Sequence, residues 1–271
     1  MHIAIDFGAS NTDVVACAGD TTRRWTLPSD GAPDERHLLA ALAAGDAPLA
    51  QVARIAVTGG NRRALPGQLS GRPLVPVDEV NAIGRGGLAL AGLDSALVVS
   101  AGSGTAAVAA TGRRCWHVTG TGVGGGTLMG LSRLLIGTVD PAEVDALAQA
   151  GDPNALNLTI GEILGGPIGR LPADTTAVNF GRVARHPVDA SPADVAAALV
   201  NMVGQVIAVI AISAARAQGL APVVVTGHLT DMPSVRATLA QVGEFYGADI
   251  RIPAGGGYAT ALGALLMAGE A

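Results

Sequence analysis

The sequence predicts an α/β protein built from two related lobes, and three observations support this prediction. Apolar, strand-like runs alternate with helical stretches along all 271 residues, which is the pattern of an α/β fold. A strand, a turn of small residues and a returning strand occur twice, about a hundred residues apart. Hydrophobic residues make up 49% of the chain and charged residues 14%, a balance typical of a globular core.

The first lobe is expected to cover residues 1–95. Runs of Ile, Val and Ala bounded by small or polar residues indicate its strands, and amphipathic runs indicate its helices. In chain order the elements are strands at 3–6, 13–18 and 25–27, a helix at 34–44, a strand at 54–58 and a helix at 79–90.

The second lobe is expected to cover residues 96–271 and repeats the opening strand–turn–strand theme. Its elements are strands at 96–100 and 106–110, a helix that opens at three glycines and runs to 135, a helix at 194–218, a strand at 223–226, a helix at 235–246, a strand at 250–253 and a helix at 259–267. The nucleotide site is expected in a cleft between the lobes.

Composition excludes several classes of partner and mechanism. The chain contains no lysine, and all 17 residues counted as Lys or Arg are arginine, so neither a lysine Schiff base nor a P-loop lysine is available. The net charge is −5 and aromatic residues make up 3%, so we expect no nucleic acid partner. Cys17 and Cys115 have neither metal-ligand spacing nor a disulfide framework.

No apolar run reaches the roughly 18 residues that a membrane span requires. The most apolar segment, 203–215, contains Gln205 and Ser213 and is interpreted as a buried helix. A strand-like run opens the chain at Ile3, with no basic segment before it. We therefore expect a cytoplasmic protein without a membrane partner.

The first candidate site is the turn between the opening strands, Asp6-Phe7-Gly8-Ala9-Ser10-Asn11-Thr12. Backbone amides at such a turn can donate to phosphate oxygens, and Gly8 permits close approach. Asp6 at the strand end can hold a hydrated Mg²⁺, which prefers oxygen ligands. Alone, the segment is equally compatible with an ordinary hairpin turn.

A second turn, Gly102-Ser103-Gly104-Thr105, follows a wholly apolar strand. Because the two hairpins occur together, they can grip the phosphates of one nucleotide between them. The run Gly120–Thr127 contains five glycines and opens a helix. A helix N-terminus preceded by glycines is an anion site, and this run is the third candidate phosphate contact.

Two carboxylates stand at the start of the helix at 79–90. Asp78 fits the role of helix N-cap, whereas Glu79 is the candidate general base for phosphoryl transfer to a hydroxyl. Near the end of the chain, Gly255-Gly256-Gly257 precedes a helix of small residues. These glycines either admit an adenine or ribose or allow tight helix–sheet packing.

Taken in order along essentially the whole chain, these motifs resemble those of the type II pantothenate kinases of the actin-like ATPase superfamily. The matching segments are Asp6–Ser10, Thr58–Gly60, Glu79 within Val77–Ala82, Gly102–Thr105, Gly124–Leu131 and Asn179–Gly181. The resemblance implies two duplicated, ribonuclease H-like lobes around a nucleotide cleft. The expected nucleotide contacts are Asp6, Gly8, Ser10, Asn11, Thr12, Gly102, Ser103, Gly104, Thr105, Gly124, Gly125, Gly126, Thr127 and Gly227.

Two positions depart from the family pattern. Asp13 stands where the family usually carries a lysine, and we interpret it as a solvated hairpin residue. His117 precedes Val118 where the family carries an arginine implicated in holding the acceptor. Histidine is shorter and not permanently charged, so a bidentate contact is not replaced in kind. Ser103 and His117 are the predicted acceptor contacts, with an ordinary strand-end histidine as the alternative for His117.

The resemblance implies transfer of the ATP γ-phosphate to the primary hydroxyl of pantothenate, the first step toward coenzyme A. In this interpretation Glu79 accepts the hydroxyl proton and Asp6 organises Mg²⁺. A homodimer is also implied, with the helix at 194–218 as an interface element.

Three alternatives remain open at the level of sequence. The acceptor could be another small hydroxyl compound, as His117 suggests. The chain could be a regulator that binds ATP or an acyl-coenzyme A without turnover, although Glu79 and all three glycine turns are retained. A reductive dehydratase activator, which shares the superfamily fold, would need cysteines to hold an iron–sulfur cluster at a dimer interface. Cys17 and Cys115 lack suitable spacing for that role.

Overall fold

A computed structural model describes residues 1–270, beginning with a six-stranded sheet in the order β3-β2-β1-β4-β6-β5. Strands β1 to β3 form an antiparallel meander, and β4 and β6 extend the sheet in parallel to β1. The strands are β1 His2–Phe7, β2 Asn11–Ala18, β3 Thr21–Pro28, β4 Arg54–Thr58, β5 Gln68–Leu69 and β6 Arg72–Pro76.

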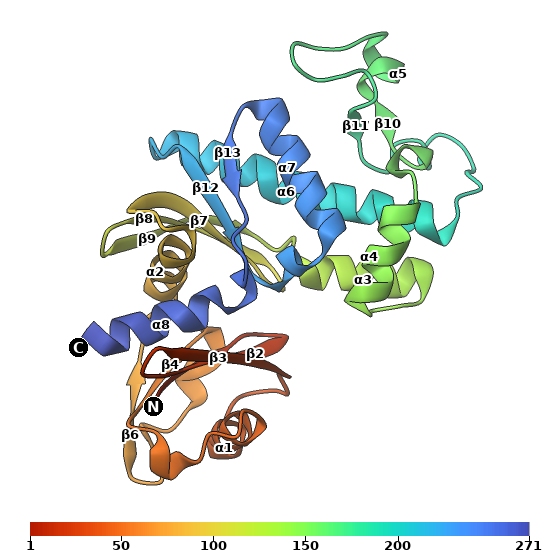
Figure 1. The fold of residues 1–271 in the computed structure, drawn as a ribbon. Coiled ribbons are helices and arrows are strands. Elements are labelled where there is room, and N and C mark those ends of the chain that lie inside the picture. The colour runs from red at the N-terminus through yellow and green to blue at the C-terminus, as the bar shows by residue number, and fades with distance from the viewer. Residues whose placement is uncertain (271) are drawn as a thin grey trace.

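Helices cover both faces of this sheet, because successive side chains of a strand point to opposite faces. Helix α1 (Glu35–Ala44) covers the face that carries Ile3 and Ile5. Helix α8 (Ala259–Glu270) covers the opposite face, where Ala4 packs with Ala264. Figure 1 shows the sheet between these two helices, although they are far apart in sequence.

The second sheet has five strands in the order β13-β12-β7-β8-β9. Its strands are β7 Ser95–Ala101, β8 Thr105–Thr111, β9 Arg114–Thr121, β12 Pro222–Thr226 and β13 Asp249–Arg251. The helices around it are α2 Glu79–Ala91, α3 Gly125–Ile136, α4 Pro141–Ala150, α6 Pro192–Ala217 and α7 Pro233–Tyr246. Val98 packs in one cluster with Ile83 of α2, whereas Leu97 faces the larger core that includes α6.

Helix α6 begins at a capping box in which Ser191 and Asp194 satisfy each other's backbone amides. More than half of its residues are buried, and its apolar side chains pack in the core of the second sheet. Among the described residues, α6 is the one helix long and apolar enough to cross a membrane, but 67% of its most apolar window is buried inside the protein. This burial is that of a core helix.

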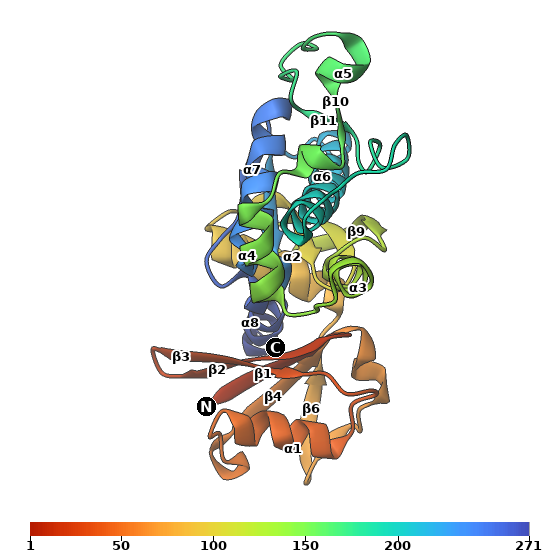
Figure 2. The ribbon, with the colours of Figure 1, turned by 90° about the vertical axis from the view of Figure 1, so that its right-hand side faces the viewer.

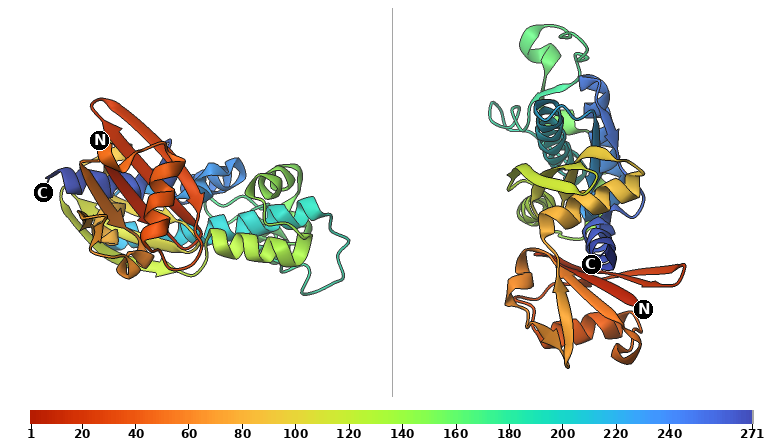
Figure 3. Two further views of the ribbon diagram at one scale, coloured as in Figure 1. Left: turned by 90° about the horizontal axis from the view of Figure 1, so that it is seen from below. Right: turned by 90° about the vertical axis from the view of Figure 1, so that its left-hand side faces the viewer.

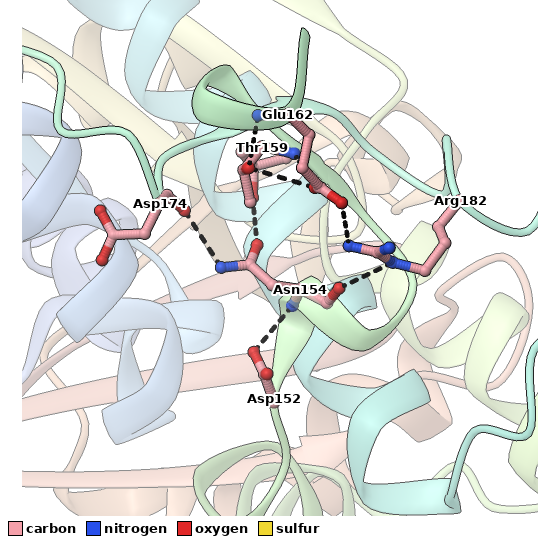
Figure 4. Close-up of polar contacts among 7 residues, drawn as sticks. Asp152, Asn154, Thr159, Glu162, Asp174 and Arg182 are labelled. Carbon is pink, nitrogen blue, oxygen red and sulfur yellow. Dashed lines mark hydrogen bonds and ion pairs between the residues drawn. The ribbon is translucent and has the colours of Figure 1, made fainter. Parts of the chain in front are cut away.

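An arm extends from the second sheet beyond α4 and α6 (Figures 1 and 2). It consists of β10 Leu158–Thr159, α5 Ile160–Leu164 and β11 Thr176–Val178. Polar contacts hold its base (Figure 4): Arg182 Nη2 donates to Glu162 Oε1 at 2.7 Å, and Asn154 Nδ2 donates to the carbonyl of Asp174 at 3.0 Å. The arm is therefore fixed at its base, and Arg170 of its tip loop lies close to Gly247 at the end of α7.

Helices α2 and α8 cross in direct backbone contact between the two sheets (Figures 1 and 3). A Cβ atom at Gly86 would overlap the carbonyl oxygen of Ala259, and one at Gly263 would overlap that of Ala82. Glycine is therefore required at both positions by close approach. This crossing connects the layers of the two sheets.

The α/β class predicted from the sequence is confirmed. The predicted strands and helices are all present, with ends shifted by a few residues. Strands β5, β6 and β9, helix α4 and the arm were not predicted. Strand β9 is a half-exposed edge strand with a glycine next to its last residue, so its pattern resembles a loop. The short 3₁₀ helices were also not predicted: Leu49–Gln51, Gly60–Ala64, Pro153–Ala155, His228–Asp231 and Gly256–Tyr258.

Candidate functional site

A cleft of about 580 Å³ lies between the two sheets and collects residues from segments far apart in sequence. All four positions that the sequence predicts to meet, Asp6, Gly102, Ser103 and Gly125, line it. The predicted site residues among its walls are Asp6, Gly8, Ser10, Asn11, Glu79, Gly102, Ser103, Gly104, Thr105, Gly125, Gly126 and Gly227.

The tips of the two hairpins touch across this cleft. Ser10 Oγ and Ser103 Oγ are 2.7 Å apart, although they are 93 residues apart in sequence. Within residues 1–270, the backbone amides of Ala9, Ser10, Ser103 and Gly104 have no hydrogen-bond acceptor. Unpaired amides at adjacent turns favour an anion, so this part of the cleft can bind phosphate oxygens.

Asp6 lies at the end of β1 with its Oδ1 atom buried and without a hydrogen-bond partner. Removal from water, and then the charges of Asp13 and Glu79, raise the pKa of Asp6 to about 8, while His228 acts in the opposite direction. An uncompensated carboxylate oxygen in a cleft fits one ligand position of Mg²⁺, which takes its other ligands from water and phosphate. Within the described residues, no group of three His, Cys, Asp or Glu side chains could hold a metal alone.

Glu79 is the first residue of α2 and lines the same cleft, half-buried. Asp78 caps the helix by accepting from the amide of Asn81 at 3.1 Å, as the sequence predicts. Burial raises the pKa of Glu79, against the opposing charge of Arg62, and Asp78 raises it further. A carboxylate with a raised pKa is a better proton acceptor than an exposed one.

The Thr58-Gly59-Gly60 turn packs between these two carboxylates. Gly59 adopts a φ of 94°, and a Cβ there would lie 2.6 Å from Asp6 Oδ1. A Cβ at Gly60 would lie 3.8 Å from Glu79 Oε2. The turn is therefore shaped by close approach to Asp6, with Glu79 just beyond it. The sequence identifies the motif, but not this positioning role.

The glycine run at the start of α3 packs against the second hairpin. The amide of Gly125 donates to the carbonyl of Gly102 at 2.8 Å, and that of Gly126 to Ser103 at 2.9 Å. Both amides are thus used within the protein, so the glycines here serve close packing of helix on hairpin. Thr127 Oγ1 caps the helix start by accepting from the amide of Gly124 and also donates to the carbonyl of Gly122, and Gly124 lies against Gly104.

Two further predicted contacts lie away from the cleft wall. Thr12 is buried, with its hydroxyl 3.0 Å from that of Ser29. His117 is exposed on β9 and is not among the residues that line the cleft. Its assignment as an acceptor contact stays a prediction.

Asp13 corrects one interpretation of the sequence. It is not a solvated hairpin residue: 6% of it is exposed, and its Oδ1 lies 2.8 Å from Nε2 of His228. Sequence reasoning missed His228 entirely. The signal that could have found it is a histidine after the strand-ending Gly227, three residues before an aspartate.

The glycines at 255–257 make packing contacts. A Cβ at Gly256 would lie 3.3 Å from Thr226 Cα, and one at Gly257 would overlap the imidazole of His228. Gly257 also lines the cleft. Of the two interpretations left open by the sequence, the structure displays tight packing, with Gly257 at the edge of the site.

Solved structures show the same fold. The activator of the 2-hydroxyisocaproyl-CoA dehydratase from Clostridium difficile, with bound ADPNP, aligns with a TM-score of 0.68 and 15% identity, covering 99% of this chain and 94% of its own. A ROK family glucokinase from Streptomyces griseus, in complex with glucose and AMPPNP, aligns with a TM-score of 0.59 and 14% identity, covering 100% and 99%. The fold is that of the actin-like ATPases.

Sequence relatives identify the family. The type II pantothenate kinase of Bacillus cereus is 27% identical over 230 residues, covering 80% of this chain and 82% of the relative. That of Staphylococcus haemolyticus is 32% identical over 177 residues, covering 65% and 66%. The Fumble family matches residues 95–267. The chain therefore belongs to the Fumble family, the family of type II pantothenate kinases.

Proposed function

We propose that this protein is an ATP-dependent kinase that phosphorylates the primary hydroxyl of pantothenate. The observation that carries the proposal is that Asp6, Glu79 and the touching tips of both hairpins line one cleft. Phosphoryl transfer requires a phosphate cradle, a carboxylate for the metal and a proton acceptor, and little covalent chemistry beyond them. The cleft supplies one candidate for each requirement.

The residues divide the work as follows. The unpaired amides at Ser10 and Ser103 hold the phosphates, and Glu79 takes the proton from the acceptor hydroxyl. Asp6 would hold Mg²⁺, which when bound neutralises charge on the β- and γ-phosphates. The Gly59 turn keeps Asp6 in place beside Glu79.

A second candidate is a kinase for a different small hydroxyl compound. The observation that favours it is the replacement of the family's lysine by Asp13, which is paired with His228 at the cleft. The identity of the acceptor is tested by a coupled ADP-release assay with pantothenate, pantetheine and a panel of small alcohols. ADP release that depends on pantothenate supports the first candidate. Release with another alcohol alone supports the second.

We further propose that the protein acts as a homodimer, as the family resemblance implies. Helix α6 is largely buried in its own lobe, which leaves few of its side chains, such as Val209, for a partner. Helix α3 packs beside α6 and exposes Leu134 by 79% and Leu135 by 54%. Because neighbouring exposed apolar side chains are a feature of protein–protein contacts, we place α3 in the proposed interface.

A further inference from the structure

His228 occupies a central position in the cleft that the proposed chemistry does not use. It opens the 3₁₀ turn His228–Asp231 directly after β12, and it lines the cleft. Its Nδ1 lies 2.6 Å from Asp231 Oδ2, and its Nε2 lies 2.8 Å from Asp13 Oδ1. Because both ring nitrogens face carboxylate oxygens, the ring satisfies both contacts when it donates from both nitrogens as an imidazolium.

The two carboxylates come from different lobes. Asp13 lies on β2 of the first sheet, directly opposite Asp6 in the antiparallel register. Thr26 on β3 donates to Asp13 at 2.6 Å and also contacts the Tyr258 hydroxyl of the second lobe at 3.1 Å. The contact between Asp13 and His228 is therefore part of a polar connection across the cleft.

Close packing by neighbouring residues fixes the position of the imidazole ring. A Cβ at Gly257 would overlap the ring, and the Tyr258 ring packs against it edge-on with centroids 5.4 Å apart. Gly227, the residue before His228, adopts a φ of 95°, and a Cβ there would overlap the backbone of Ala101. Ala101 ends the strand that leads into the second phosphate hairpin. The turn that carries His228 is thus packed directly against that hairpin.

His228 also offsets part of the negative charge of the cleft. Asp6, Asp13 and Glu79 all line the cleft, and among its described lining residues His228 is the one basic side chain. Hydrogen bonds that the ring donates to Asp13 and then to Asp231 raise the pKa of His228 to about 10, so the ring is cationic at neutral pH. A polyanionic nucleotide enters more readily when one of the carboxylates is already paired.

We propose that His228 is a positioning residue for phosphoryl transfer, which clamps Asp13 of the first lobe to the second phosphate hairpin and so sets the distance between Asp6 and that hairpin. The predicted effect of this clamp on turnover rests on the proposed kinase function. Its predicted effect on nucleotide binding does not. Direct measurement of MgATP affinity therefore tests it even if no acceptor is found.

The test is a double-mutant cycle with His228→Gln, Asp13→Asn and the combined variant, measured by MgATP titration calorimetry and by ADP release. His228→Gln leaves Asp13 buried without its cation, so we expect MgATP affinity and kcat each to fall at least about tenfold. The combined variant replaces both charges with neutral partners and should recover part of that loss, which is the coupling expected of residues in contact. His186→Gln, at an exposed loop position, is the matched control and should match the unmodified protein.

Two milder variants keep the test decisive if His228→Gln fails to fold. Gly257→Ala displaces the ring without removing it, and Asp231→Asn removes the charge of the more exposed of its two partners. Both should lower MgATP affinity in the same direction. Unchanged affinity in folded His228→Gln, or in both milder variants, overturns the proposal. Additive losses in the cycle also overturn it, because independent residues show no coupling.

Discussion

At the scale of single residues, Glu79 and Asp6 share one cleft but have different surroundings. Glu79 sits half-buried at a helix start, whereas Asp6 Oδ1 is buried without a partner. We propose that the first accepts a proton and that the second binds a cation. Substitution of Glu79 and substitution of Asp6 should therefore have different effects on activity and stability.

Glu79→Gln removes the proposed proton acceptor while keeping size and polarity. We expect kcat for ADP release to fall by on the order of a hundredfold or more, with MgATP affinity nearly unchanged. Steady-state kinetics and nucleotide titration measure the two effects separately, with Glu244→Gln on the exposed face of α7 as control. An unchanged kcat would remove Glu79 from this role.

Asp6→Asn should change the pH dependence of stability in the ligand-free protein. Because the pKa of Asp6 is raised to about 8, the folded protein holds this proton more tightly than the unfolded chain does. The carboxyl group therefore costs stability progressively as pH rises from about 4 to about 8. Asn removes that cost, so the stability of the variant relative to the parent should rise by at least about 1 kcal/mol from pH 5 to pH 8.

Urea unfolding at several pH values measures this difference. Parallel pH profiles for the two proteins would show that Asp6 ionises normally before any ligand binds. Activity should be lost in the same variant, since an amide is a poorer ligand for Mg²⁺ than a carboxylate.

At the scale of elements, the crossing of α2 and α8 depends on glycines at which the two backbones touch. We expect Gly86→Ala to destabilise the protein by about 2 kcal/mol or more, because its Cβ has no space beside Ala259. Gly130→Ala is the matched control, since Gly130 lies exposed in α3 with no atom near its Cβ position. That change should stabilise by about 0.5–1 kcal/mol. Thermal and urea unfolding of both variants decide the comparison.

Elements also show what the sequence could and could not predict. Asp6 and Gly102 follow strongly apolar strands, so local pattern alone located both hairpins. The partnership of Asp13 with His228 could not be found this way, because 215 residues separate them and the contact exists only once the lobes are assembled. Likewise, the amides of Gly125 and Gly126 appeared free in the sequence, but the folded hairpin uses both.

At the scale of the whole molecule, the proposed homodimer makes α3 a region of contact between copies. Leu134→Glu should shift the protein from dimer to monomer, because a charge is costly in an apolar interface. Sedimentation velocity at micromolar concentration measures the change, with Leu39→Glu on α1 as control at another exposed leucine. A monomeric parent protein, or a dimeric Leu134→Glu variant, would contradict this assignment.

The placement of α8 also has a consequence for the order of events during synthesis. This helix supplies one of the two layers around the sheet of residues 2–76, yet it is translated about 180 residues after β6. At bacterial-type rates of roughly 5–20 residues per second, Ala4 and Ala56 wait on the order of ten seconds or more for their cover on the ribosome. Because the side chains on that face are mainly small alanines, little apolar surface is exposed during the delay. The nascent first lobe can therefore remain without its last helix and still not aggregate with another chain.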